Sequence, residues 1–315
     1  MYYLGVDLGG TNIAAGVVDE NYRIIARANR KTHVPCTPDE ICCQIAGTVF
    51  DAIENAGETV DSFKYIGIGT PGAVNRDTGI VEYANNLHFT NLELQKLLKE
   101  RVRKDVIIEN DANAAAYGEY KAGVLKGATN ALAITLGTGI GSGIIINGAI
   151  YAGTNFSAGE MGHMVIAAGG RECTCGRKGC WEAYASATGL INMTKEEMAK
   201  TDKNSEMWRT AGSLDNVDGR TAFDAMRKGD AAAKKVVDGY IYYLACGIIN
   251  CINILEPDKL CIGGGISNEG ESLLAPLREY VARENYAKNS KKQTVICKAS
   301  LGNDAGIIGA ALLGE

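Results

Sequence analysis

The chain has 315 residues, a formal net charge of −5 at pH 7, an apolar share of 46 % and a charged share of 22 %. This composition is ordinary for a globular protein and excludes collagen, coiled coil and intrinsic disorder. No basic block is visible, which argues against a nucleic-acid binder. At roughly 150 residues per domain, the length predicts two domains, or one large one.

Strands alternate with helices along the first third of the chain. Apolar runs bounded by turn residues predict strands at 2–8, 13–19, 22–29, 65–69 and 106–108. Helical spacing predicts helices at 38–56, 92–102 and 111–121, the first with Thr37 as N-cap and Gly57 as its stop. This alternation is typical of α/β layers.

The pattern continues after a segment without a clear period. A strand at 131–136 is followed by a glycine-rich hairpin up to residue 150, and we expect 151–180 to form a long functional loop. Beyond it the spacing predicts helices near 182–190, 194–200, 220–228, 231–255, 271–284 and 304–313, and strands at 260–262 and 294–297.

One apolar stretch, 236–255, is long enough to cross a bilayer. It carries Asp238, Gly239, Asn250 and Asn253, and such polar residues are costly in lipid. We therefore expect a buried core helix. The first residues lack a basic region followed by an apolar run, so we expect no signal peptide and a cytoplasmic protein.

A weak internal echo suggests how the domains divide. LGVDLGGTNIAAGVV at 4–18 and LAITLGTGIGSGIII at 132–146 share a strand, a glycine pair and a second strand. Two similar halves would each present a glycine hairpin to a common cleft. We place the domain boundary near residue 112.

Both glycine hairpins are candidate phosphate sites. Asp7, Gly9, Gly10 and Thr11 end the first strand, and Gly137, Thr138 and Gly139 end its counterpart. Glycines let backbone N–H groups approach a phosphate, threonine adds a hydroxyl donor, and Asp7 could hold Mg²⁺ through water. The alternative for DLGG is a plain β-turn. Neither motif is a P-loop, because no Gly-Lys-Ser/Thr follows.

Three of the ten cysteines lie close together. Cys173, Cys175 and Cys180, with His163 upstream, form a closed set of three thiolates and one imidazole, which is typical of structural zinc. Gly176 and Gly179 permit the tight turns that the set needs. The alternative is free thiols or a redox pair.

Three further groups carry candidate chemistry. Asp111 follows a strand and opens a helix, so it is either an N-cap or a general base. Glu160, His163 and Glu182 flank the cysteine loop and suit a sugar, although solvated loop charge is the alternative. Gly263, Gly264 and Gly265 end a strand, either as a close approach to a nucleotide or as a helix entry.

Six motifs in a fixed order carry a resemblance. DLGGT, ENDANAAAYGE, LGTGIGSG, GEMGH, CTCGRKGCWE and CIGGGI occur one after another over nearly the whole chain. Together they resemble the ROK family of sugar kinases and repressors, and most of all its glucokinases. The cysteine loop with the preceding GEMGH is the most specific part, since many ATPases share DLGGT.

The resemblance implies an actin-like, hexokinase-like ATPase fold, in which two α/β domains close around the substrates. The final helix would return to the N-terminal domain, so that the domains would comprise 1–112 with 301–315, and 113–300. The implied activity is ATP-dependent phosphorylation of the 6-hydroxyl of glucose, with Mg²⁺ bound with ATP and zinc as a structural ion.

The resemblance also implies a role for each site residue. Asp111 would be the general base. The sugar would be bound by Gly72, Asn86, Asn110, Asp111, Glu160, His163 and Glu182. His163 would bind zinc through one ring nitrogen and face the sugar with the other. ATP would be bound by Asp7, Gly9, Gly10, Thr11, Asn12, Gly137, Thr138, Gly139, Gly264 and Gly265.

Several alternatives stay open at this point. A repressor of the family would carry a DNA-binding domain ahead of DLGGT, and because DLGGT begins at Asp7 we expect no such domain; a silent sugar sensor would lack turnover. Another hexose (N-acetylmannosamine, N-acetylglucosamine, fructose, mannose or allose) differs from glucose by pocket contacts worth only ~1–3 kcal/mol. Some relatives resemble polyphosphate users, and relatives are commonly homodimers or homotetramers.

Overall fold

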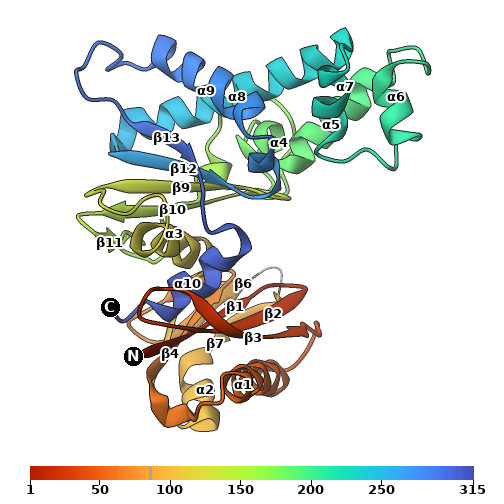
Figure 1. The fold of residues 1–315 in the computed structure, drawn as a ribbon. Coiled ribbons are helices and arrows are strands. Elements are labelled where there is room, and N and C mark those ends of the chain that lie inside the picture. The colour runs from red at the N-terminus through yellow and green to blue at the C-terminus, as the bar shows by residue number, and fades with distance from the viewer. Residues whose placement is uncertain (85–86) are drawn as a thin grey trace. The chain divides into compact units, whose positions relative to one another are not determined.

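The computed structural model describes residues 1–84 and 87–315, which form two compact units (Figure 1). The first unit comprises Met1–Ala133, Gly143–Gly159 and Ser300–Glu315, and the second comprises Ile134–Ser142 and Glu160–Ala299. Both contain strands and helices, which confirms the predicted α/β class.

A five-stranded sheet organises the first unit, in the order β3-β2-β1-β4-β8. Its strands are β1 (Tyr2–Leu8), β2 (Asn12–Val18), β3 (Ile24–Lys31), β4 (Phe63–Thr70) and β8 (Val106–Asn110). β1, β4 and β8 run parallel, whereas β2 pairs antiparallel with β1 and β3 pairs antiparallel with β2. The carboxyl ends of the three parallel strands therefore meet at one edge of the sheet.

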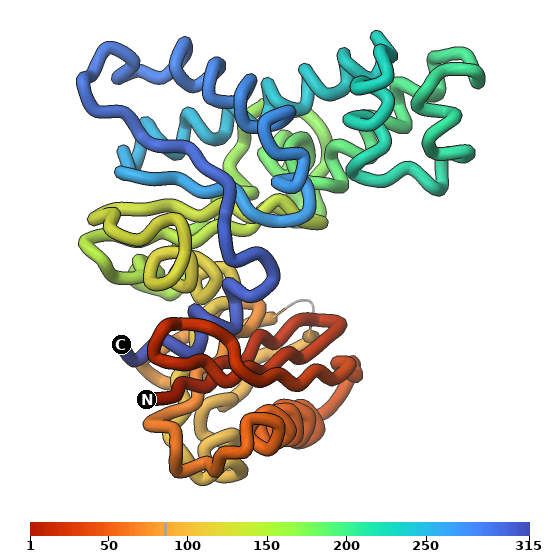
Figure 2. The backbone as a smooth tube through the Cα atoms, viewed as in Figure 1, coloured from red at the N-terminus to blue at the C-terminus, as the bar shows by residue number. Residues whose placement is uncertain are grey.

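Helices cover both faces of this sheet. They are α1 (Pro38–Asn55), α2 (Leu94–Val102), α3 (Asp111–Lys121) and α10 (Ala305–Ala311). Leu4, Val6 and Leu8 share a buried apolar cluster with residues of α1. Gly5 faces α10, and side chains alternate along a strand, so α1 and α10 lie on opposite faces. α10, near the dark blue end of the chain, thus lies beside the red N-terminal strands (Figure 2).

The predicted boundary near residue 112 differs from the division into compact units. Residues 113–133 group with the first unit, because α3 packs closely on α10. The resemblance implied that the final helix returns to the N-terminal domain. The packing of this helix, α10, on α3 keeps α3 in the first unit.

A small sheet in the first unit had no counterpart in the predicted elements. It contains β5 (Ala73–Asn75), β6 (Ile80–Ala84) and β7 (Phe89–Leu92), in the order β5-β6-β7. These strands are too short to show a clear alternation of apolar and polar residues.

The second sheet has the order β11-β10-β9-β12-β13. Its strands are β9 (Ala131–Leu136), β10 (Ile140–Ile146), β11 (Ala149–Ile150), β12 (Lys259–Gly263) and β13 (Val295–Lys298). β9 and β10 hold the places in this sheet that β1 and β2 hold in the first. The internal echo therefore marks equivalent strands of two similar sheets.

The helices of the second unit are α4 (Glu182–Ala185), α5 (Ala187–Met198), α6 (Glu206–Ala211), α7 (Thr221–Arg227), α8 (Ala231–Leu255) and α9 (Glu271–Glu284). The predicted break between 190 and 194 is wrong. The chain breaks at Ser186 instead, whose hydroxyl accepts from the backbone N–H of Gly189 and caps α5. α6 was not predicted.

Helix α8 is long and apolar enough to cross a membrane, the one such helix in the described residues. It packs against α4, α5, α7 and α9. Gly247 lets the fully buried indole of Trp181 lie directly on the α8 backbone, and Tyr240 Oη donates to the carbonyl of Ala185. These contacts make α8 the core helix of the second unit, as predicted.

Glycines set the close approach of α3 and α10, which gives a first testable prediction. A Cβ at Gly309 would overlap the carbonyl oxygen of Ala114 in α3. In an open helix Gly→Ala gains about 1 kcal/mol, but this overlap is expected to make Gly309→Ala destabilising by about 2 kcal/mol. Urea unfolding measures the difference.

Gly239→Ala in α8 is the matched control, because its nearest neighbour is the flexible end of Met193 at 3.3 Å. It should be neutral or stabilising. Equal stability of the two variants would contradict the proposed packing of α10 on α3.

Candidate functional site

In the first unit, the two predicted acids Asp7 and Asp111 lie at the same end of the parallel strands, Asp7 on β1 and Asp111 directly after β8. Asp7 of β1 pairs with Gly69 of β4, and Gly69 pairs with Glu109 of β8, so Asp7 and the start of α3 lie at the same sheet edge. A Cβ at Gly69 would lie 3.5 Å from the Cα of Asp111. Strand register thus brings together two carboxylates that are distant in the sequence.

The cap of α3 is Asn110, not Asp111. Asn110 Oδ1 accepts from the backbone N–H groups of Ala112 and Asn113, while Asn110 Nδ2 donates to the carbonyl of Gly72 over 3.1 Å. Asp111 is the first helical residue, and its Oδ1 accepts from the N–H of Ala112. The N-cap alternative for Asp111 is therefore wrong, because its neighbour already performs that role.

Asp7 is an unusual acid. Its burial and the negative charge of Asp111 raise the pKa of Asp7 to about 6. Gly306 lets α10 approach, since a Cβ there would lie 2.9 Å from Asp7 Oδ2. Two carboxylates at one buried edge suit a cation held together with phosphate groups.

The raised pKa predicts how Asp7 affects stability. The folded chain holds this proton more tightly than the unfolded chain, whose aspartate pKa is about 3.9, so stability is lost as pH rises from about 4 to about 6. Asp7→Asn carries no charge and escapes that loss. We expect it to stabilise the ligand-free protein by about 2 kcal/mol near neutral pH, shrinking toward pH 4.

Urea unfolding across this pH range measures the effect. Asp61→Asn is the control, because that carboxylate is 92 % exposed and should change stability by less than about 0.5 kcal/mol. A destabilised Asp7→Asn protein near neutral pH would contradict the raised pKa.

Thr32, the residue after β3, holds the first glycine turn in place. Gly9 N–H donates to the carbonyl of Asn12 over 2.9 Å. Thr32 Oγ1 donates to the carbonyl of Gly9, and Thr32 N–H donates to the carbonyl of Thr11. Thr32 was missed in the sequence, because a threonine after a strand carries no signal of its own.

In the second unit, the second glycine turn is held by the segment after the cysteine loop. Ala187 N–H donates to the carbonyl of Gly137, and Thr188 Oγ1 donates to the carbonyl of Thr138 over 2.7 Å. Glu182 Oε2 accepts from the N–H of Ile140. Thr188 is a second residue that the sequence did not single out.

The other glycine motif of this unit lies next to that turn. Gly264 adopts φ +82°, and a Cβ there would overlap the backbone of Leu136, the residue before Gly137. Gly265 begins a short 3₁₀ helix, Gly265–Glu269. The absence of a side chain at Gly264 therefore lets the ends of β12 and β9 approach each other closely.

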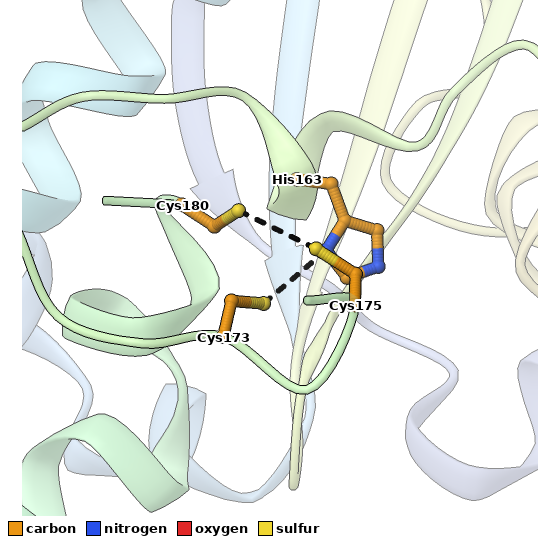
Figure 3. A group of neighbouring side chains, drawn as sticks. All are labelled: His163, Cys173, Cys175 and Cys180. Atoms are coloured by element: carbon orange, nitrogen blue, oxygen red, sulfur yellow. Dashed lines mark hydrogen bonds between the residues drawn. The ribbon is translucent and has the colours of Figure 1, made fainter. Parts of the chain in front are cut away.

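The cysteine loop brings its four predicted ligands together (Figure 3). All their ligand atoms lie within 4.8 Å of one another. Cys175 Sγ is 3.7 Å from Cys180 Sγ, and Cys173 Sγ is 3.6 Å from His163 Nδ1. Nitrogen and sulfur ligands around one tetrahedral zinc ion lie about 3.4–3.8 Å apart, so the set fits this metal and no disulfide.

Glycine turns and backbone hydrogen bonds shape the cysteine loop. Gly176 and Gly179 have φ of +86° and +85°, the left-handed conformation that favours glycine. Cys173 N–H donates to the carbonyl of Arg177, and Gly179 N–H donates to the carbonyl of Arg171. The predicted role of both glycines is confirmed.

The predicted sugar ligands of the second unit belong to the same loop. Glu160 is exposed and precedes the 3₁₀ helix Met161–His163. Glu182 Oε1 lies 3.8 Å from Cys173 Sγ. Because His163 Nδ1 faces the thiols, its Nε2 remains for another contact. Asn86, predicted to contact the sugar, lies outside the described residues.

Comparison with known proteins now adds to this geometry. Residues 3–315 match the ROK family model. The chain belongs to the ROK family. It is 38 % identical to the glucokinase of Thermotoga maritima over 310 residues, covering 98 % of this chain and 95 % of that protein.

Two further relatives extend the likeness. A glucokinase of Streptomyces coelicolor is 38 % identical over 313 residues, 98 % of this chain and 96 % of that protein. The crystal structure of a ROK family glucokinase from Streptomyces griseus, in complex with glucose and AMPPNP, is 35 % identical with a TM-score of 0.83, covering 99 % of this chain and 98 % of that chain. Within the ROK family, this chain thus resembles glucokinases along its full length.

Proposed function

We propose that this ROK protein transfers the terminal phosphate of ATP to the 6-hydroxyl of glucose, with Asp111 as general base. Asp111 takes the hydroxyl proton, the oxygen forms a bond to phosphorus, and the bridging oxygen leaves with ADP. The observation that carries this proposal is the carboxylate at the first residue of α3, whose cap is Asn110. Full-length likeness to glucokinases supports the substrate.

The predicted sugar-binding residues are retained as proposals. In the first unit we assign Gly72, Asn110 and Asp111, with Asn86 retained as a proposal from the sequence. In the second we assign Glu160, His163 and Glu182. Carboxylates, amides and imidazole both accept and donate, which suits the adjacent hydroxyls of a sugar.

The nucleotide-binding residues are the glycine turns. We assign the ATP phosphates to Gly9, Gly10, Thr11 and Asn12 in the first unit, and to Gly137, Thr138 and Gly139 in the second. Gly264 and Gly265 then approach the adenosine. Mg²⁺, when bound with ATP, supplies positive charge for the phosphates, and Asp7 would hold it through water.

The cysteine loop would hold zinc through His163, Cys173, Cys175 and Cys180. Four protein ligands leave no open position, so zinc supplies structural support only. Glu182 contacts this loop and also accepts from the N–H of Ile140. The loop therefore also restrains Glu182, a proposed sugar-binding residue, and the second glycine turn. Reduced cysteines fit the cytoplasmic location that we propose. A homodimer or homotetramer is a further proposal, which light scattering tests.

A panel of hexoses and N-acetylhexosamines tests the function. ADP release from Mg-ATP is measured for each sugar, and the product is identified by mass. Turnover on glucose that yields the 6-phosphate is expected, with polyphosphate a poor donor. Preference for an N-acetyl sugar would overturn the substrate, and saturable sugar binding without turnover would indicate a sensor.

A further inference from the structure

Glu109, the last residue but one of β8, is a buried acid that the proposed reaction does not use. Its side chain is 1 % exposed. Burial raises the pKa of Glu109, while hydrogen bonding by Asn113 and the charge of Arg76 act in the opposite direction. A buried carboxylate is costly unless several groups compensate it, so its contacts show what it holds.

The Oε1 atom of Glu109 contacts residues that precede and follow Asp111 in the chain. It accepts from the backbone N–H of Asn110 over 2.8 Å and from Asn113 Nδ2 over 3.0 Å. Asn110 directly precedes Asp111, and Asn113 follows it by two residues in the first turn of α3. One oxygen atom therefore spans the strand-to-helix junction at which Asp111 begins the helix.

The Oε2 atom ties this junction to the small sheet. It lies 3.0 Å from Nη1 of Arg76, an ion pair without hydrogen-bond geometry. Arg76 follows β5, and Asn110 Nδ2 separately donates to the carbonyl of Gly72, just before β5. Two contacts thus join the β8–α3 junction to opposite ends of β5.

We propose that Glu109 is a positioning residue for Asp111: its Oε1 holds the first turn of α3, while its Oε2 is paired with Arg76. This inference rests on the proposed function of Asp111. The first N–H groups of a helix have no partner within the helix, so side chains hold its start. Asn110 supplies that cap in α3, and Glu109 in turn holds the backbone N–H of Asn110. A general base loses much of its effect when it shifts by a fraction of an ångström.

Two substitutions of Glu109 test the proposal, one that removes both side-chain oxygen atoms and one that keeps an acceptor oxygen. Glu109→Leu fills the buried space but removes both contacts of Oε1, and we expect kcat to fall about 30-fold while KM for glucose and for ATP stay within about threefold. Glu109→Gln keeps an acceptor for Asn110 and Asn113, and should keep kcat within about threefold. Arg76 is 36 % exposed and can turn to solvent.

Glu119→Leu is the matched control. Glu119 is also buried, at 2 % exposure, and lies on α3, where it accepts from the backbone N–H groups of Ser300 and Leu301. We expect it to lower Tm at least as much as Glu109→Leu, with kcat per glucose-binding site within about threefold of the wild type. The stoichiometry of glucose binding counts the folded sites.

Two outcomes would overturn the inference. One is an equal fall of kcat in Glu119→Leu, which would tie the effect to the loss of any buried carboxylate on this segment. The other is an equal fall in Glu109→Gln and Glu109→Leu, which would exclude the role of Oε1. Asp111→Asn measured alongside distinguishes the proposals: its full activity would remove the proposed base, whereas its inactivity beside an active Glu109→Leu would remove only the positioning role.

Discussion

Asp111→Asn is expected to lower kcat for glucose by about 10²- to 10⁴-fold while the Kd for glucose stays within about threefold. Asparagine has nearly the shape of aspartate and keeps an oxygen that can accept from the N–H of Ala112. It cannot take a proton from the sugar hydroxyl. The cap of α3 is unaffected, because Asn110 supplies it.

Steady-state ADP release and calorimetric glucose binding measure the two quantities. Asp105→Asn is the control. Asp105 lies just before β8, is exposed and forms an ion pair with Lys99. We expect it to leave kcat unchanged. Near-normal turnover of Asp111→Asn would remove the base assignment, and loss of glucose binding would show that the substitution had damaged the site itself.

Removal of zinc is the second large expected effect. A chelator should release one zinc ion per chain, lower Tm by about 10 °C and weaken glucose binding at least about tenfold. Without zinc, no ion would hold the thiols of Cys173, Cys175 and Cys180 together, in a loop that has little regular structure. His163 and Glu182, both proposed sugar ligands, depend on that loop.

Cys175→Ser tests the same site without a chelator. It should bind less zinc and show the same loss of Tm and of glucose binding. Cys43→Ser is the matched control, because Cys43 is likewise exposed but lies on α1 in the first unit. Full zinc content and normal Tm in Cys175→Ser would contradict the site, as would an equal loss in both variants.

Much of the fold could be predicted from local pattern. Apolar runs and helical spacing located the strands of both large sheets and most helices, because periodicity and capping residues act over a few positions. The short strands β5–β7 and helix α6 escaped, since each is too brief to show a period. Ser186 escaped because a serine inside an apolar stretch signals a cap only when the chain is seen to turn there.

The candidate site was predictable only in part. Cys173, Cys175, Cys180 and His163 are close in sequence, and their spacing alone indicated zinc. The role of Asp111 was ambiguous, because an aspartate at the start of a helix can be either the N-cap or a general base. Thr32, Thr188 and Glu109 could not be singled out, since each acts through partners far along the chain or through burial.

The sequence by itself determined the α/β class, the two glycine turns and the cluster of His163 with three cysteines, because short-range spacing encodes them, and its ordered motifs carried the resemblance to the ROK family. The tertiary structure alone decided that Asp7 lies near Asp111 and that α10 holds α3 in the first unit. Those relations arise from strand register and helix packing between residues as much as two hundred positions apart, for which no local pattern exists.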